Sequence, residues 1–130
     1  MLGKSDFQEL VAAARDACAR SYSPYSHFPV GAALHTADGR VFAACNVENA
    51  SYGLTVCAER SAIFSMVAAG AREIAALVVY TSTGSPVTPC GACRQVLIEF
   101  GRDADVVCVC SSEQSLSFKA GDLLPHAFRL

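Results

Sequence analysis

The sequence lacks the features that indicate binding to a nucleic acid or to a membrane. It contains no run of lysine or arginine, and its formal net charge is −2. Because polyanion binding depends on clustered cations, we expect no nucleic-acid polymer as a partner. No apolar run approaches the ~20 residues that a membrane-spanning helix needs, so we expect no membrane partner either.

We also expect no secretory signal, since residues 1–6 lead directly into an amphipathic stretch. The seven cysteines therefore do not suggest a disulfide framework, and clustered thiols in a reduced chain indicate metal binding or catalysis instead. We expect a cytoplasmic protein whose residues 1–130 form a single domain.

Hydrophobic periodicity and turn residues predict an alternation of helices and strands. The first helix is expected over 5–20, opened by the capping box Ser5-Asp6-Phe7-Gln8. The Asp38-Gly39 pair predicts a hairpin between strands over 30–34 and 40–44. The further expected elements are a helix over 57–69, a strand over 74–81, a helix over 94–100, a strand over 105–110 and a short edge strand over 116–119. Strands that alternate with helices indicate an α/β fold with parallel crossovers after the hairpin.

Two thiols stand three residues apart in the segment Pro89-Cys90-Gly91-Ala92-Cys93, at a predicted helix start. Side chains at this spacing share one face of a helix, so both sulfurs can converge on one ion. The positive end of the helix dipole also favours thiolate over thiol. Taken alone, such a pair would equally suit a redox site or half of a structural zinc site.

A third cysteine makes the pattern more specific. Cys57 stands at the start of another predicted helix, and Glu59 follows two residues later. Three thiolates would leave the fourth tetrahedral position of a zinc ion open, which distinguishes a catalytic site from a structural one. A cysteine, a glutamate two residues later and a Pro-Cys-x-x-Cys segment together form the signature of zinc deaminases. The other cysteines, which lack metal-ligand spacing and are expected to be structural, are Cys18, Cys45, Cys108 and Cys110.

Four segments of the sequence closely resemble the small homotetrameric cytidine deaminases. They are residues 25–34, 45–60, 89–96 and 123–128, and the resemblance extends over about residues 22–128. It implies an α/β fold, a three-layer α/β/α sandwich with a mixed five-stranded sheet. It also implies one Zn²⁺ per subunit, a small nucleoside as substrate, and a homotetramer whose active sites are shared between subunits.

The resemblance gives each residue of the zinc motif a role. Cys57, Cys90 and Cys93 hold the metal, and Glu59 carries protons between water, the ring nitrogen and the leaving ammonia. Three thiolates around Zn²⁺ leave a net charge of −1 (2 − 3), which neighbouring groups must offset. Arg60 would contribute by hydrogen-bonding to thiolate sulfur; a surface ion pair is its alternative role.

A second group of residues is expected to bind the nucleoside. Asn46 and Glu48 alternate at the end of a predicted strand and so point to one side, where an amide and a carboxylate suit sugar hydroxyls; the alternative is a polar turn. The resemblance implies that they hold the ribose, Glu48 chiefly at the 3′-hydroxyl. By resemblance Phe28 packs against the pyrimidine, although in isolation a core position would be the more ordinary interpretation. The other residues implied by the resemblance are the Ala58 N–H and the Thr88 carbonyl at the base edge, and Ala50, Tyr52 and Phe128, which reach across subunit interfaces.

The expected reaction is hydrolytic deamination of cytidine and deoxycytidine to uridine and deoxyuridine plus ammonia, a step of pyrimidine salvage. A deaminase of a cytosine nucleoside antibiotic of the blasticidin type would share the zinc motif, but Phe28 and the segment 46–49 favour an ordinary ribose. A polynucleotide-editing deaminase is disfavoured by the acidic charge balance and the short chain. From another class, the cysteines could form a structural zinc-binding module, against which Glu59 beside only three ligands is the main argument.

Overall fold

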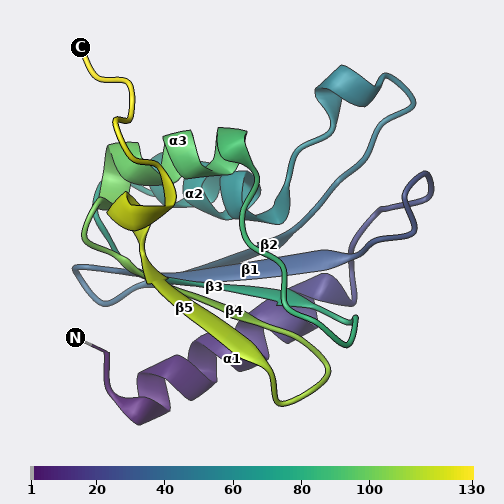
Figure 1. Cartoon of the computed structure of the whole chain (residues 1–130), viewed down its shortest axis with the longest axis horizontal. Helices are drawn as coiled ribbons and strands as arrows, with labels where there is room; N and C mark the ends of the chain where they lie inside the picture. Colours follow the sequence, from purple (N-terminus) through teal and green to yellow (C-terminus); the bar gives the residue numbers. More distant parts are fainter. Residues whose placement is uncertain (1) are drawn as a thin grey trace.

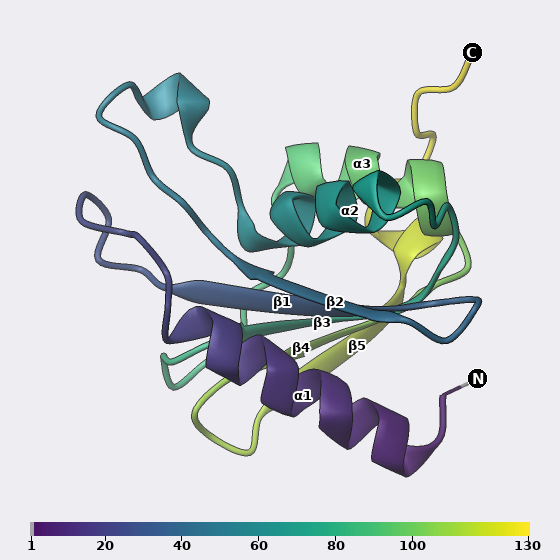
Figure 2. The same cartoon turned by 180° about the vertical axis from the view of Figure 1, so that it is seen from behind.

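The computed structural model describes residues 2–130 and consists of three layers (Figures 1 and 2). Helix α1 covers one face of a five-stranded sheet, and helices α2 and α3 cover the other. Among the described residues, no helix combines the length and apolarity needed to cross a bilayer. The elements are α1 (Lys4–Cys18), β1 (Val30–Thr36), β2 (Val41–Cys45), α2 (Ala58–Ala68), β3 (Ile74–Thr81), α3 (Gly91–Gly101), β4 (Asp105–Val109) and β5 (Ser115–Lys119), with short 3₁₀ turns at Tyr52–Leu54 and Ala120–Leu123. The expected α/β fold with a mixed five-stranded sheet is confirmed.

The topology of the sheet brings two helix N-termini to one edge. The strand order is β2-β1-β3-β4-β5. Because β2 and β3 are both antiparallel to β1, they run in the same direction, and β4 is parallel to β3. Helix α2 follows β2 and helix α3 follows β3, so both helices begin at the carboxyl ends of strands that point the same way. In α/β sheets this edge is where ligands bind.

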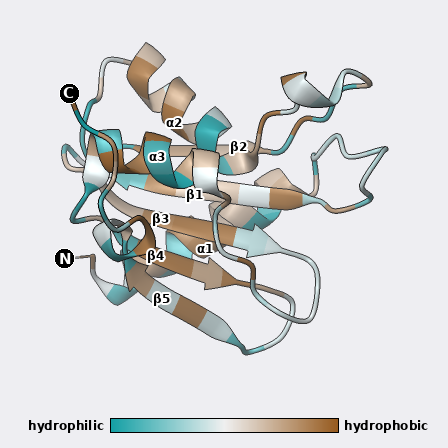
Figure 3. Ribbon diagram, turned by 45° about the horizontal axis from the view of Figure 1, so that its top comes forward, coloured by the Kyte–Doolittle hydropathy of each residue, from teal (hydrophilic) through white to brown (hydrophobic). Residues whose placement is uncertain are grey.

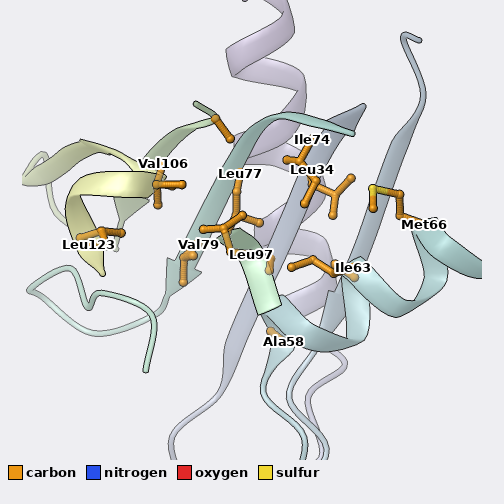
Figure 4. Close-up of a cluster of buried hydrophobic side chains, with 14 of the residues drawn as sticks. Leu34, Ala58, Ile63, Met66, Ile74, Leu77, Val79, Leu97, Val106 and Leu123 are labelled. Atoms are coloured by element: carbon orange, nitrogen blue, oxygen red, sulfur yellow. The ribbon is translucent and has the colours of Figure 1, made fainter. Parts of the chain in front are cut away.

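The core is built on both faces of strand β3. Leu77 and Val79 pack into the cluster beneath α2 and α3 (Figure 4). Val78 and Tyr80, whose side chains alternate with them, pack into the cluster beneath α1. Figure 3 shows hydrophobic colour along β3 and β4, as expected for strands covered on both sides.

The start of α1 differs from the prediction. The helix begins at Lys4 with Gly3 as its N-cap, and no side chain among residues 2–130 supplies a capping hydrogen bond. The carbonyl of Gly3 accepts the N–H of Phe7 at 3.1 Å, so the helical pattern is established before Ser5. The predicted capping box was wrong because Ser5 lies inside the first turn, where its hydroxyl cannot act as an N-cap.

Gly31 is the point where α1 lies closest to the sheet. A Cβ atom at this position would lie 1.9 Å from the carbonyl oxygen of Ala14 and 2.7 Å from the backbone nitrogen of Cys18. We expect Gly31→Ala to lower the free energy of unfolding by about 3 kcal/mol or more, the upper end of the usual cost of overpacking, because backbone atoms must move to make room. Urea denaturation checks this. Gly84→Ala, where no described atom lies within 4 Å of the new Cβ, is the matched control, and equal losses would contradict the expected clash.

Candidate active site

The three cysteines of the zinc motif meet at the N-termini of α2 and α3. Cys57 is the N-cap of α2, Cys90 is the N-cap of α3, and Cys93 lies in the first turn of α3. The Sγ atoms of Cys57 and Cys90 are 3.7 Å apart, those of Cys90 and Cys93 are 3.4 Å apart, and all three lie within 4.8 Å of one another. Tetrahedral zinc with Zn–S bonds of ~2.3 Å holds its sulfurs ~3.8 Å apart, so the group fits one zinc ion with the fourth position open.

The surroundings of Cys57 favour the thiolate form that binds metal. A hydrogen bond from the Cys93 thiol, with a second from Arg60, lowers the pKa of Cys57 to about 5. The same contact with Cys57, together with burial, raises the pKa of Cys93. Nη2 of Arg60 lies 3.6 Å from Sγ of Cys57, which is the contact the sequence led us to expect. The effect of Arg60 on a zinc site stays a prediction.

Glu59 is buried beside the cysteines. Only 4% of its surface is exposed, and it lies in the first turn of α2. Burial raises the pKa of its carboxyl group to about 7, because removal from water disfavours the charged form. A carboxyl group with a pKa near neutrality can both accept and donate a proton, as general acid–base chemistry requires.

One cavity connects the cysteines to the expected nucleoside-binding residues. Its volume is about 360 Å³, and its lining includes Cys57, Cys90 and Glu59. The predicted residues that also line it are Phe28, Asn46, Glu48, Ala58 and Thr88. A larger cavity of about 620 Å³ lies between the start of α1 and strands β4 and β5, but no cysteine is among the described residues that line it. The chemistry of the lining, not its size, identifies the candidate site.

Asn46 and Glu48, which follow β2, both make hydrogen bonds to residues 25–30, the segment that leads into β1. Oδ1 of Asn46 accepts the Val30 N–H at 2.9 Å and its Nδ2 donates to the Phe28 carbonyl at 2.9 Å. Oε1 of Glu48 accepts the N–H groups of Tyr25 and Ser26 at 2.9 and 3.1 Å. Hydrogen bonding, first from the Ser26 hydroxyl, lowers the pKa of Glu48. Glu48 therefore presents an ionised carboxylate at the cavity wall.

Three of the predicted residues lie outside this cavity in the single chain. Ala50 is exposed, and Tyr52 and Phe128 expose 74% and 71% of their surfaces. Tyr52 belongs to the segment between β2 and α2 that projects from the body of the molecule, and Phe128 belongs to the C-terminal tail (Figure 1). The structure does not bring these three to the cysteines of their own chain.

Sequence reasoning missed the side chains that hold the site's loops. Arg94, directly after Cys93, donates from Nε to the Pro89 carbonyl at 2.8 Å and from Nη2 to Oγ1 of Thr88 at 3.0 Å. Its Nη1 also donates to the Leu123 carbonyl at 2.9 Å, which ties the C-terminal segment to α3. An arginine in the first turn of α3, beside the metal loop, was the available signal.

Comparison with known proteins gives a consistent result. The family model described as the cytidine and deoxycytidylate deaminase zinc-binding region matches residues 4–110. Among curated relatives, a cytidine deaminase of Sporosarcina psychrophila is 50% identical over 73% of this chain and 70% of its own length. One from Halalkalibacterium halodurans is 44% identical over 95% of this chain and 94% of its own length.

Solved structures agree with the relatives found by sequence. The crystal structure of cytidine deaminase from Burkholderia pseudomallei matches with a TM-score of 0.89 and 53% identity, over 93% of this chain and 98% of that one. That of the enzyme from Mycobacterium tuberculosis matches with a TM-score of 0.82 and 43% identity, over 96% and 98% of the two chains. The family model covers most of the chain, including all three cysteines and Glu59, and the chain therefore belongs to the cytidine and deoxycytidylate deaminase family.

Proposed function

We propose that this protein hydrolyses cytidine and deoxycytidine to uridine and deoxyuridine plus ammonia, as a single-domain, cytoplasmic enzyme of pyrimidine salvage. The observation that carries the proposal is the cavity of about 360 Å³, where Glu59 and the sugar-binding candidates Asn46 and Glu48 meet two cysteines, Cys57 and Cys90, of the three-cysteine group. Relatives and solved structures named cytidine deaminases support the choice of substrate.

Glu59 is the group that moves protons in the proposed reaction. Cys57, Cys90 and Cys93 would hold the zinc ion, which would supply the Lewis acidity that makes a water molecule nucleophilic. The Glu59 carboxylate takes a proton from that water and delivers it to the ring nitrogen beside carbon 4. It then carries the second proton to the departing amino group, which leaves as ammonia. Burial of Glu59 excludes bulk water that could otherwise serve in its place.

The remaining lining of the cavity suits a pyrimidine nucleoside. Ala58 is the first residue of α2, where backbone N–H groups have no partner inside the helix. Its N–H can therefore donate to the base edge, while the Thr88 carbonyl accepts from the amino group. Phe28, half-buried at the cavity wall, offers a flat apolar surface to the ring. Glu48 accepts hydrogen bonds from sugar hydroxyls, with Asn46 beside it.

We also propose that the enzyme is a homotetramer with shared active sites. Ala50, Tyr52 and Phe128 are exposed in the single chain, and the two aromatic side chains among them, Tyr52 and Phe128, are of the kind enriched at interfaces between subunits. Nε2 of Gln95 donates to the Phe128 carbonyl at 3.3 Å, so the tail that carries this ring is tied to α3.

Mixed oligomers test whether Phe128 completes a neighbour's site. Phe128→Ala removes a ring that would bury up to ~150–250 Å² against substrate, so we expect a higher KM and unchanged zinc content. Glu59→Gln chains co-assembled with Phe128→Ala chains would form some sites with both side chains intact. Activity above both parents is the expected result. No recovery in verified mixed oligomers would place Phe128 in its own subunit.

A substrate panel tests the proposed function directly. Ammonia release is measured with cytidine, deoxycytidine, cytosine, cytidine monophosphate and blasticidin S, alongside zinc content. We expect turnover of the two nucleosides with one zinc per chain. Preference for blasticidin S would favour the antibiotic deaminase, and zinc without any turnover would favour a structural zinc module.

A further inference from the structure

The hydroxyl group of Ser26 connects two parts of the candidate site. It donates a hydrogen bond to Oε2 of Glu48 and accepts the N–H of Phe28 at 3.0 Å. A serine hydroxyl has one hydrogen to donate and can accept in return, so both contacts form at once. The sugar-binding candidate Glu48 and the backbone of the base-packing candidate Phe28 are thereby fixed relative to each other.

The loop around Ser26 occupies both oxygens of the Glu48 carboxylate. Oε1 accepts two backbone N–H groups, from Tyr25 and Ser26, whereas Oε2 accepts the Ser26 hydroxyl alone. A free glutamate side chain rotates about several bonds, and ordering it on substrate binding costs conformational entropy. These three hydrogen bonds order it beforehand. Oε2, with a single partner, keeps a lone pair for an incoming hydroxyl group.

Ser26 and Glu48 also stand at a boundary in the site. Both line the cavity of about 360 Å³ that holds Cys57, Cys90 and Glu59, and both line a neighbouring cavity of about 380 Å³ together with Tyr25, Tyr52 and Thr55. An ionised carboxylate only accepts hydrogen bonds. Oε2 of Glu48, held between the two cavities, therefore favours a ligand that places a hydroxyl donor beside it.

We propose that Ser26 is a positioning residue for sugar recognition: its hydroxyl aims Oε2 of Glu48 at the 3′-hydroxyl of the nucleoside. The inference rests on the proposed function for its substrate. It goes beyond that function in assigning the geometry of sugar recognition to a residue that need not touch the substrate.

The test compares Ser26→Ala on two substrates that differ by one hydroxyl. Hydrogen bonds to charged groups change affinity by about ten- to a hundredfold, and because two backbone donors to Glu48 remain, we expect the lower end. KM for cytidine should rise about tenfold with kcat nearly unchanged, since the contact is made equally in the bound and transition states. With 3′-deoxycytidine, KM should change less than about threefold. A loss of equal size on both substrates would overturn the proposal.

Two further variants separate positioning from loop stability. Ser26→Thr keeps the hydroxyl and should restore KM for cytidine. Ser23→Ala removes a hydroxyl from the same loop that contacts Oγ of Ser21 at 3.2 Å, and it should leave both substrates unaffected. Failure of the threonine variant to restore KM, or an equal effect of Ser23→Ala, would contradict the assignment.

Calorimetry tests the positioning role of Ser26 separately from the proposed reaction, because it measures ligand binding without turnover. Uridine should bind the wild-type protein more tightly than 3′-deoxyuridine does, and Ser26→Ala should remove most of that difference. If the protein binds uridine in this way but releases no ammonia from cytidine, the reaction is wrong and the positioning role stands. If the two ligands bind equally to the wild-type protein, the positioning role is wrong.

Discussion

Glu59→Gln is expected to lower kcat for cytidine by about 10⁴-fold or more, because losses for general acid–base groups are typically ~10²–10⁴-fold and this one lies at the upper end or beyond. The amide has nearly the same shape as the carboxyl group, but it cannot carry a proton. One side chain serves several proton transfers in the proposed reaction, and it is 96% removed from solvent, with 4% exposed, so water cannot readily replace it. Steady-state kinetics with cytidine, alongside zinc analysis, provide the measurement.

The control makes the same chemical change at an exposed carboxylate. Glu73, just before β3, is exposed and does not line the cavity of about 360 Å³ that holds Glu59, so Glu73→Gln should retain wild-type turnover. Glu59→Gln should keep the wild-type zinc content, because Glu59 is not among the three residues grouped for metal binding. Retention of more than about a tenth of the wild-type turnover would remove Glu59 from the role of proton carrier.

The part of the site that could be predicted from sequence is local. Cys90 and Cys93 share a helix face because of their spacing, and Cys57 and Glu59 fall at the start of a helix whose hydrophobic pattern is readable. Parallel strands then bring the two helix starts together, since crossovers in α/β sheets follow regular rules. Each step depends on residues close in sequence or on a general property of sheets.

The hydrogen bonds of the loop before β1 could not be predicted in the same way. Ser26 and Glu48 are 22 residues apart, and their meeting depends on the path of a loop without periodicity. That path includes His27 in the left-handed region at φ 56°, a conformation that few residues other than glycine adopt. A weaker signal was present, because serine hydroxyls often accept the N–H two residues ahead, as Ser26 does from Phe28.

The second large effect is expected from Cys90→Ala, which should lose zinc and activity together. Cys90 supplies one of three sulfurs and joins α3 to α2, through Sγ contacts of 3.4 Å to Cys93 and 3.7 Å to Cys57. Loss of a group that only supports a ligand typically costs about 10–100-fold in metal affinity, and loss of the ligand itself should exceed that. Metal analysis after gel filtration, with ammonia release from cytidine, measures both consequences.

Cys108→Ala is the matched control for this prediction, because it also replaces a thiol with a methyl group. Cys108 is fully buried in the core beneath α2 and α3 and is not one of the grouped residues Cys57, Cys90 and Cys93. Its loss should cost on the order of 1 kcal/mol of stability with zinc and turnover retained. Wild-type protein stripped with a chelator should match Cys90→Ala in activity and regain turnover on addition of zinc, whereas Cys90→Ala should not. A full zinc content in purified Cys90→Ala would show that the ion is held elsewhere. The cysteines at the N-termini of α2 and α3 would then not be the zinc ligands.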